Sequence, residues 1–147
     1  MPSPIDARGS ASTANKHILI ADDEEIVRDA AARMLTRAGY TVSTAANGLE
    51  VLEILSQNNH TDMLVLDLTM PVLSGRETLL RVSDSYPNLP VLLCTGHLMD
   101  SDLSMLSTHS LVDVITKPFR AQTLLRSVEV GLHGPLGVPQ QSSLESA

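Results

Sequence analysis

The chain has 147 residues, of which 43% are hydrophobic and 18% are charged, so it has room for one domain with a modest core and is not a disordered chain. Its formal net charge of −7 disfavours binding to nucleic acid or to an anionic membrane through the field of the whole molecule. A single cysteine, Cys94, excludes an internal disulfide framework and favours a reducing compartment. Because Cys94 ends an apolar run, it is predicted to be a small buried residue and not a nucleophile.

The two ends of the chain differ in composition from its middle. Residues 1–15 are rich in Ser, Ala and Pro and lack the apolar stretch of a signal peptide, and from His133 the chain turns to Gly, Pro, Gln and Ser. No stretch approaches the length of a membrane span. These observations predict a disordered leader over 1–15, one domain over 16–132 and a disordered tail over 133–147, in a cytoplasmic protein.

Five short apolar segments alternate with segments in which apolar residues recur at helical spacing. The strands are predicted at His17–Ala21, Tyr40–Thr44, Met63–Leu66, Val91–Cys94 and Leu111–Ile115. This alternation predicts an α/β fold, with a parallel sheet covered by helices on both faces and right-handed crossovers between its strands.

Apolar positions and capping residues define the helices between these strands. In the first helix, apolar residues recur at helical spacing at Ile26, Val27, Ala30, Ala31, Met34, Leu35 and Ala38; the second runs through Leu49, Leu52 and Leu55; the third has its apolar side at Leu79, Leu80 and Val82. Asn47 with Glu50, and Ser74 with Glu77, are predicted to cap the second and third helices. The fourth helix, over 100–110, is predicted to be short or labile because its serines and threonines compete for backbone hydrogen bonds.

The third strand is apolar without a break until it reaches Asp67. Such a run predicts a central strand buried on both faces, with the carboxylate at its end. In open α/β sheets, ligands bind at the carboxyl ends of the strands. Asp67 is therefore either a ligand-site residue or a cap for the following turn, and this strand alone favours neither interpretation.

Polar side chains follow four of the five predicted strands, and parallel strands would bring them to one edge of the sheet. These side chains are Asp22 and Asp23 after the first strand, Asp67 after the third, Thr95 after the fourth and Lys117 after the fifth. Three carboxylates in one crevice repel each other unless a cation lies among them, and carboxylate oxygens suit Mg²⁺, which bridges to phosphate. A carboxylate can also attack phosphorus to form an aspartyl phosphate, while an ammonium and a hydroxyl hold the phosphoryl oxygens.

These residues lie in four motifs, Ile18–Glu24, Leu64–Pro71 with Gly75, Leu93–Gly96 and Thr116–Phe119. In content, order and spacing, the motifs resemble those of response-regulator receiver domains, and the resemblance extends over residues 16–132. It implies a flavodoxin-like doubly wound sheet of five parallel strands in the order 2-1-3-4-5, with helices on both faces.

The resemblance implies that Asp67 is the phosphoacceptor and takes a phosphoryl group from a histidine kinase or a histidine phosphotransfer protein. Asp22, Asp23 and Asp67, with the backbone carbonyl of Thr69, would hold Mg²⁺ or Mn²⁺. Lys117 and Thr95 would contact the phosphoryl oxygens.

The same resemblance also assigns one peptide bond and two loop residues, whereas the interpretation of Glu24 and Glu25 rests on the helix dipole. The peptide bond between Lys117 and Pro118 is expected to be cis, which proline permits at low cost. Thr69 and His97, two positions after the acceptor and the threonine, either tune the loss of the phosphoryl group or are simply exposed loop residues. Glu24 and Glu25 are expected only to complement the dipole of the first helix.

The implied function is a stand-alone or hybrid-kinase-like receiver without an output domain, which switches its binding to a downstream protein and contacts neither nucleic acid nor membrane. It would be no enzyme beyond its own phosphorylation and dephosphorylation. The alternative is a Mg²⁺-dependent phosphohydrolase acting through an aspartyl phosphate, although Thr69 stands where haloacid-dehalogenase-like enzymes have a second aspartate. A dinucleotide-binding fold is excluded, since no G-x-G-x-x-G follows the first strand.

The sequence departs from the family pattern on the side where the signal leaves. Val114 takes the place of the usual aromatic residue three positions before the lysine, Ser110-Leu111 replaces a small Gly-Ala pair, and Gly96 replaces an alanine after the threonine. We therefore hypothesise that signalling depends on reordering of the loop and the fourth helix and not on an aromatic rotamer.

Overall fold

The computed structural model describes residues 16–57, 60–96 and 111–133. Its five strands form one parallel sheet in the order β2-β1-β3-β4-β5. The strands are β1 (His17–Ala21), β2 (Thr41–Ala45), β3 (Met63–Asp67), β4 (Val91–Thr95) and β5 (Leu111–Thr116). The helices are α2 (Glu25–Arg37), α3 (Gly48–Gln57), α4 (Gly75–Ser85) and α6 (Ala121–His133). The predicted fold class and strand order are confirmed.

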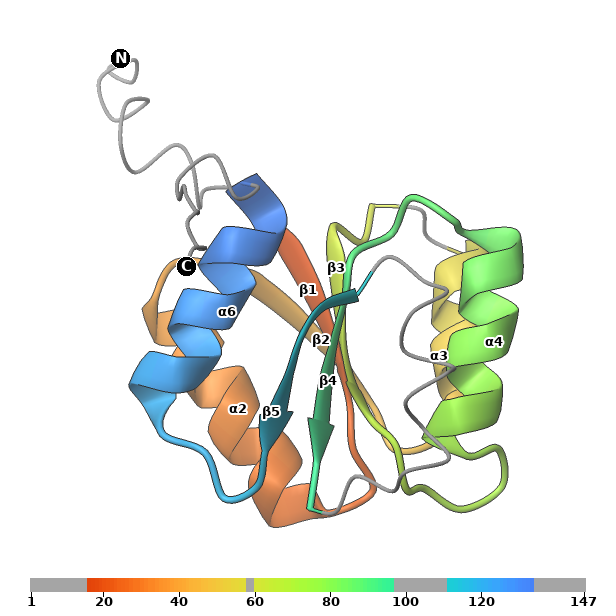
Figure 1. The fold of residues 1–147 in the computed structure, drawn as a ribbon, viewed down its shortest axis with the longest axis horizontal. Coiled ribbons are helices and arrows are strands. Elements are labelled where there is room, and N and C mark those ends of the chain that lie inside the picture. Colours follow the sequence, from red (N-terminus) through yellow and green to blue (C-terminus); the bar gives the residue numbers. More distant parts are fainter. Residues whose placement is uncertain (1–15, 58–59, 97–110, 134–147) are drawn as a thin grey trace, which may run out of the picture.

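Helices cover both faces of the sheet, with α2 and α6 on one side and α3 and α4 on the other (Figure 1). Predictions made for residues 1–15, for the fourth helix over 100–110, for His97 and for residues 134–147 lie outside the described residues. Within the described ranges, no helix is both long and apolar enough to cross a membrane.

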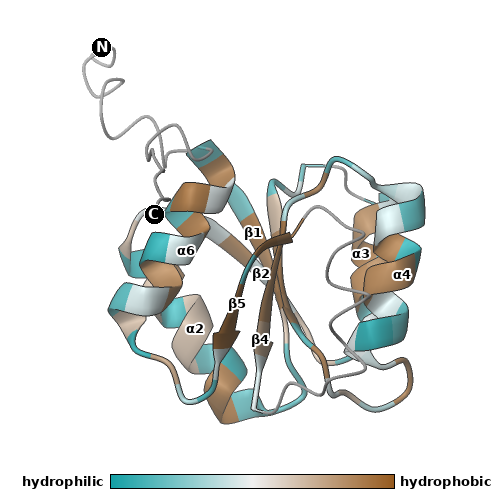
Figure 2. Ribbon diagram, in the orientation of Figure 1, coloured by the Kyte–Doolittle hydropathy of each residue, from teal (hydrophilic) through white to brown (hydrophobic). Residues whose placement is uncertain are grey.

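The central strand β3 is buried at all five positions, as its apolar run predicts. It lies between β1 and β4, and its side chains alternate between two core clusters. Met63 and Val65 pack on the side of α2 and α6, whereas Leu64 and Leu66 pack on the side of α3 and α4. Figure 2 shows hydrophobic colouring along most of β4 and β5, whereas hydrophobic and hydrophilic residues alternate along the helices. Because neither face of β3 is polar, Asp67 at its end is the first polar side chain of the strand.

Three of the apolar residues that mark the predicted helices are exposed: Ile26 is 84% exposed, Leu49 is 50% exposed and Leu80 is 48% exposed. The buried face of α2 is centred on Ala31 and Leu35, and Ile26, five residues before Ala31, is rotated by about 140° around the helix. Leu80 is rotated by about 100° from the buried Leu79. Hydrophobicity alone therefore overestimated the width of the buried stripe.

The predicted helix caps are confirmed by hydrogen bonds. The backbone N–H of Glu50 donates to Asn47 Oδ1 at 3.0 Å, and the Glu50 carboxylate accepts from the N–H of Ala46 at 2.8 Å. At the start of α4, the N–H of Glu77 donates to Ser74 Oγ at 3.1 Å. These caps fix where α3 and α4 begin relative to the ends of β2 and β3.

Candidate functional site

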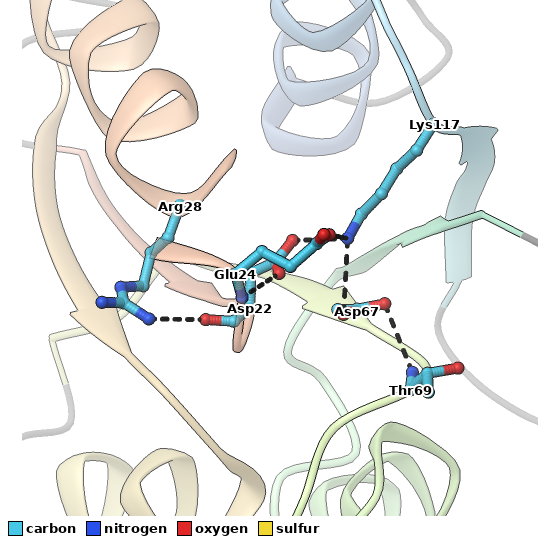
Figure 3. A network of polar contacts seen from close by, with 6 residues as sticks. All are labelled: Asp22, Glu24, Arg28, Asp67, Thr69 and Lys117. Carbon is cyan, nitrogen blue, oxygen red and sulfur yellow. Dashed lines mark hydrogen bonds and ion pairs between the residues drawn. The ribbon is translucent and has the colours of Figure 1, made fainter. Parts of the chain in front are cut away.

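The carboxyl ends of β1, β3 and β5 bring charged side chains together at one rim of the sheet (Figure 3). Asp22 and Asp67 are each only 4% exposed, whereas Asp23 is exposed. One carboxylate oxygen from each of these three aspartates lies within 4.8 Å of the others. The structure thus gathers the three carboxylates that the sequence placed at strand ends.

The position of Asp67 is fixed by the backbone around it. Its Oδ1 accepts the N–H of Thr69 at 3.2 Å, and the N–H of Gly75 donates to the carbonyl of Leu68 at 2.9 Å. A Cβ at position 75 would overlap the backbone carbonyl oxygen of Asp67. Glycine is therefore required where α4 begins, because the helix passes directly against the end of β3.

Asp22 is held at the end of β1 by three hydrogen bonds. Its Oδ1 accepts the N–H of Glu24 at 2.9 Å, its carbonyl accepts from Arg28 Nη1 at 2.8 Å, and its N–H donates to the carbonyl of Ala45 at 3.1 Å. These contacts leave Asp22 Oδ2 directed into the site.

Lys117 joins the carboxylates from the end of β5. Its Nζ lies 2.8 Å from Asp22 Oδ2, 3.1 Å from Glu24 Oε1 and 3.4 Å from Asp67 Oδ2 (Figure 3). Burial opposes the charged form of the ammonium, but the hydrogen bonds to Asp22 and Glu24 and the nearby negative charges outweigh it and raise the pKa of Lys117. The peptide bond that follows, Lys117–Pro118, is cis.

The negative charge of Asp67 is only partly compensated by the groups around it. Burial, together with a smaller effect from the charge of Asp22, raises the pKa of Asp67 from 3.8 to about 6 against the opposing effects of the Thr69 N–H and Lys117. One ammonium thus contacts two buried carboxylates, Asp22 and Asp67, and the exposed Glu24, while the exposed Asp23 adds a further carboxylate to the cluster. A group of carboxylate oxygens with excess negative charge fits a hard divalent cation such as Mg²⁺ or Mn²⁺.

Two predicted residues lie at the rim in less direct roles. Thr95 ends β4, is 1% exposed and accepts the N–H of Lys117 through its carbonyl at 2.8 Å. Thr69 is exposed in the loop after β3 and contributes its N–H to Asp67. Their assignments as a phosphoryl contact and as a cation ligand stay predictions, as does the role of His97, which lies outside the described residues.

The sequence prediction for Glu24 is incomplete. Glu24 occupies the N-cap position of α2, but its side chain makes no cap hydrogen bond and contacts Lys117 instead. The two residues are 93 positions apart, so no local pattern indicates the contact. The available signal is topological, since both follow strands that end at the same rim. Arg28 was also missed, and it supports Asp22 from the first turns of α2.

A groove of about 470 Å³ opens beside Lys117. Its lining residues are Glu24, Ile26, Val27, Ala30, Met34, Gly96, Lys117, Pro118 and Phe119. Ile26, which is 84% exposed, is one of the apolar residues that border this groove. An apolar surface therefore lies next to the charged rim.

Comparison with known proteins agrees with this site. Residues 18–129 match the family profile described as response regulator receiver domain. The response regulator MprA of Mycobacterium sp. (strain KMS) is 34% identical over 108 residues, which are 74% of this chain and 46% of MprA. The sensor kinase CckA of Brucella abortus is 30% identical over 125 residues, 84% of this chain and 13% of CckA. The chain thus spans less than half the length of each of these two relatives.

Solved structures give the same result. The response regulator TrrA from Thermotoga maritima, solved in complex with Mg(2+)-BeF, is 30% identical with a TM-score of 0.69, and the match covers 78% of this chain and 96% of TrrA. Members of the matched family are phosphoacceptors in two-component signalling that interact with histidine kinases or phosphotransfer proteins, and they are signalling domains and not conventional enzymes. The phosphohydrolase alternative is not favoured. Motifs, strand order, rim geometry and profile together show that the chain belongs to the response-regulator receiver domain family.

Proposed function

We propose that Asp67 is the phosphoacceptor of this receiver. The observation that carries the proposal is its position: a buried carboxylate at the end of the central strand, 3.4 Å from Lys117 Nζ and clustered with two further carboxylates. An Asp67 oxygen would attack the phosphorus of a partner's phosphohistidine, so that a P–O bond forms as the P–N bond to the imidazole breaks. Burial serves this reaction, because fixed charges act strongly where water is excluded.

The remaining rim residues are proposed to bind the cation and the phosphoryl oxygens. Asp22, Asp23 and Asp67, with the Thr69 carbonyl, would hold Mg²⁺ or Mn²⁺, and the ion would neutralise charge on the transferred group. The Lys117 ammonium and the Thr95 hydroxyl would contact the phosphoryl oxygens. Thr69 and His97 are proposed to tune how quickly the phosphoryl group is lost.

The partner is proposed to be a histidine kinase or a histidine phosphotransfer protein. Its phosphohistidine has to reach Asp67 across the rim, and the groove between α2 and the segment from Lys117 to Phe119 borders that approach. The exposed Ile26 offers an apolar contact there.

We propose that the receiver unit extends over residues 16–132 and that it exchanges the phosphoryl group with its partner in the cytoplasm. The buried free thiol of Cys94 fits a reducing compartment of this kind. The downstream partner is proposed to be another protein and not nucleic acid.

The test is incubation with acetyl phosphate and Mg²⁺ followed by intact-mass measurement. Wild type is expected to gain the mass of one phosphoryl group, and the gain should be absent in Asp67→Asn and in wild type with EDTA. Asp84→Asn, which removes an exposed carboxylate on α4, is the matched control and should still be modified. A phosphoryl group that persists in Asp67→Asn would show that the acceptor is elsewhere.

A further inference from the structure

We propose that Glu24 is a positioning residue that acts through Lys117, by receiving the ammonium group when a divalent cation takes Asp22 and Asp67. This inference rests on the cation role proposed above for the rim. It assigns a specific task to the acidic residue that follows the aspartate pair.

The first step is the hydrogen-bonding capacity of Lys117. An ammonium group has three N–H donors and no acceptor. Lys117 Nζ has one carboxylate neighbour for each donor, with Asp22 at 2.8 Å, Glu24 at 3.1 Å and Asp67 at 3.4 Å. Without a cation, the ammonium is therefore the local counter-charge for both buried aspartates.

The second step is competition. Two of the residues that Lys117 contacts, Asp22 and Asp67, belong to the cluster of carboxylates that could hold a metal ion. Glu24 does not belong to that cluster. A cation and an ammonium on the same oxygens repel each other, so Lys117 has to weaken its hold on these two aspartates when the ion binds. Among the described residues, Glu24 is its one carboxylate contact that the cation does not need.

The third step is the freedom of the Glu24 side chain. The backbone of Glu24 is fixed, since its N–H donates to Asp22 Oδ1 at 2.9 Å and its carbonyl accepts the N–H of Arg28 at 2.9 Å. Its side chain is 60% exposed and makes no cap hydrogen bond to α2. The carboxylate is therefore anchored beside the rim yet able to follow the ammonium outward.

It follows that loss of the Glu24 charge should weaken cation binding in two ways. It removes one negative charge near the ion, and of the carboxylates in the described part of the chain it leaves Lys117 only the two aspartates that the ion needs. Glu25 separates these effects, because it is an exposed carboxylate one residue further along and is not among the three carboxylates that Lys117 contacts. Glu25→Gln makes the same change in charge without removing the contact.

The experiment measures the dissociation constant of Mn²⁺ alone by calorimetric titration of the full chain. Wild type, Glu24→Gln and Glu25→Gln are compared in the chain that keeps Lys117. The same comparison is then repeated in chains that also carry Lys117→Met. Glu24→Gln is expected to weaken Mn²⁺ binding about threefold or more beyond Glu25→Gln when Lys117 is present, at the low end of couplings between residues in contact. With Lys117→Met, the two glutamine variants should bind Mn²⁺ equally.

Two results would overturn the inference while leaving the cation role intact. Equal affinities for Glu24→Gln and Glu25→Gln in the presence of Lys117 would show a simple charge effect. An excess loss that persists with Lys117→Met would show that Glu24 acts directly on the ion. Failure of wild type to bind Mn²⁺, or binding unaffected by Asp67→Asn, would instead remove the proposed cation function and this inference with it.

Discussion

The carboxylate of Asp67 is almost fully buried, and one lysine that it shares with Asp22 and Glu24 provides its counter-charge. Its raised pKa, about 6 against an ordinary 3.8, results chiefly from burial. The same feature that prepares Asp67 for a cation and a phosphoryl group therefore destabilises the folded chain when neither is bound. A functional residue that costs stability is common at sites where charge must develop or bind.

The loss of stability caused by the buried Asp67 carboxylate should appear when the unfolding free energies of wild type and Asp67→Asn are compared across pH in EDTA. Well below pH 3.8, the carboxyl is protonated in both the folded and unfolded chain. As pH rises from 3.8 to about 6, the unfolded chain ionises first, so wild type loses stability, and above pH 6 the loss is complete. Asp67→Asn lacks this titration, and roughly two pKa units correspond to a gain of about 3 kcal/mol in its unfolding free energy at pH 7.5.

Urea unfolding at pH 4 and pH 7.5 measures this effect. The gain from Asp67→Asn should be much smaller at pH 4, and Asp84→Asn is the control for the loss of one exposed negative charge. An Asp67→Asn protein no more stable than wild type at pH 7.5 would mean that Lys117 already compensates the charge.

At the scale of elements, the loop from β3 to α4 sets the shape of the site. Val72 has a positive φ of 67°, which is rare for a β-branched residue, and the N–H of Leu73 donates to the carbonyl of Pro71 across it at 2.7 Å. The tight turn returns the chain so that Gly75 meets the backbone of Asp67. The geometry of the acceptor thus depends on the start of α4.

Gly75→Ala should lower the free energy of unfolding by about 1–3 kcal/mol, as overpacking typically does. It should also reduce phosphorylation by acetyl phosphate, because the backbone of Asp67 has to move. Gly96→Ala is the matched control, since a Cβ there meets no atom of the described residues within 4 Å. Urea denaturation measures the free energy of unfolding of both variants. Equal values for Gly75→Ala and Gly96→Ala would contradict the close approach at Gly75.

Strands and helix starts could be predicted where a single sequence feature identified them. The apolar runs gave the strands to within a residue, and side-chain caps at Asn47 and Ser74 located two helix starts. The exposure of Ile26 was not predictable, because a hydrophobic residue at helical spacing does not by itself show which side of the helix packs on the sheet. The positive φ of Val72 carries no sequence signal of the kind that glycine would give.

At the scale of the whole molecule, parallel strands explain why the site could be inferred before the structure. Every strand points its carboxyl end to one rim, so a list of strand-terminal residues already contains Asp22, Asp23, Asp67, Thr95 and Lys117. What the list lacks is side-chain direction. The Glu24–Lys117 contact joins residues 93 positions apart and depends on how α2 begins relative to the end of β5.

Binding of a cation to this rim should stabilise the whole fold, because the unfolded chain does not gather the carboxylates. A ligand at about 100 times its dissociation constant adds about 2.7 kcal/mol. Mg²⁺ should therefore raise the Tm, EDTA should reverse the rise, and Asp22→Asn should reduce it. The rise should be larger at pH 7.5 than at pH 5, where protonation of Asp67 competes with the ion. A Tm that does not respond to Mg²⁺ would contradict a cation site.

The central claim is that Asp67 carries the phosphoryl group, and chemical trapping tests it most directly. The chain is treated with acetyl phosphate and Mg²⁺, then with sodium borohydride, which reduces an aspartyl phosphate to homoserine, and its peptides are sequenced by mass spectrometry. We predict homoserine at position 67 and at no other aspartate position, and no homoserine when EDTA is present. Homoserine at another carboxylate position, with Asp67 intact, would contradict the account.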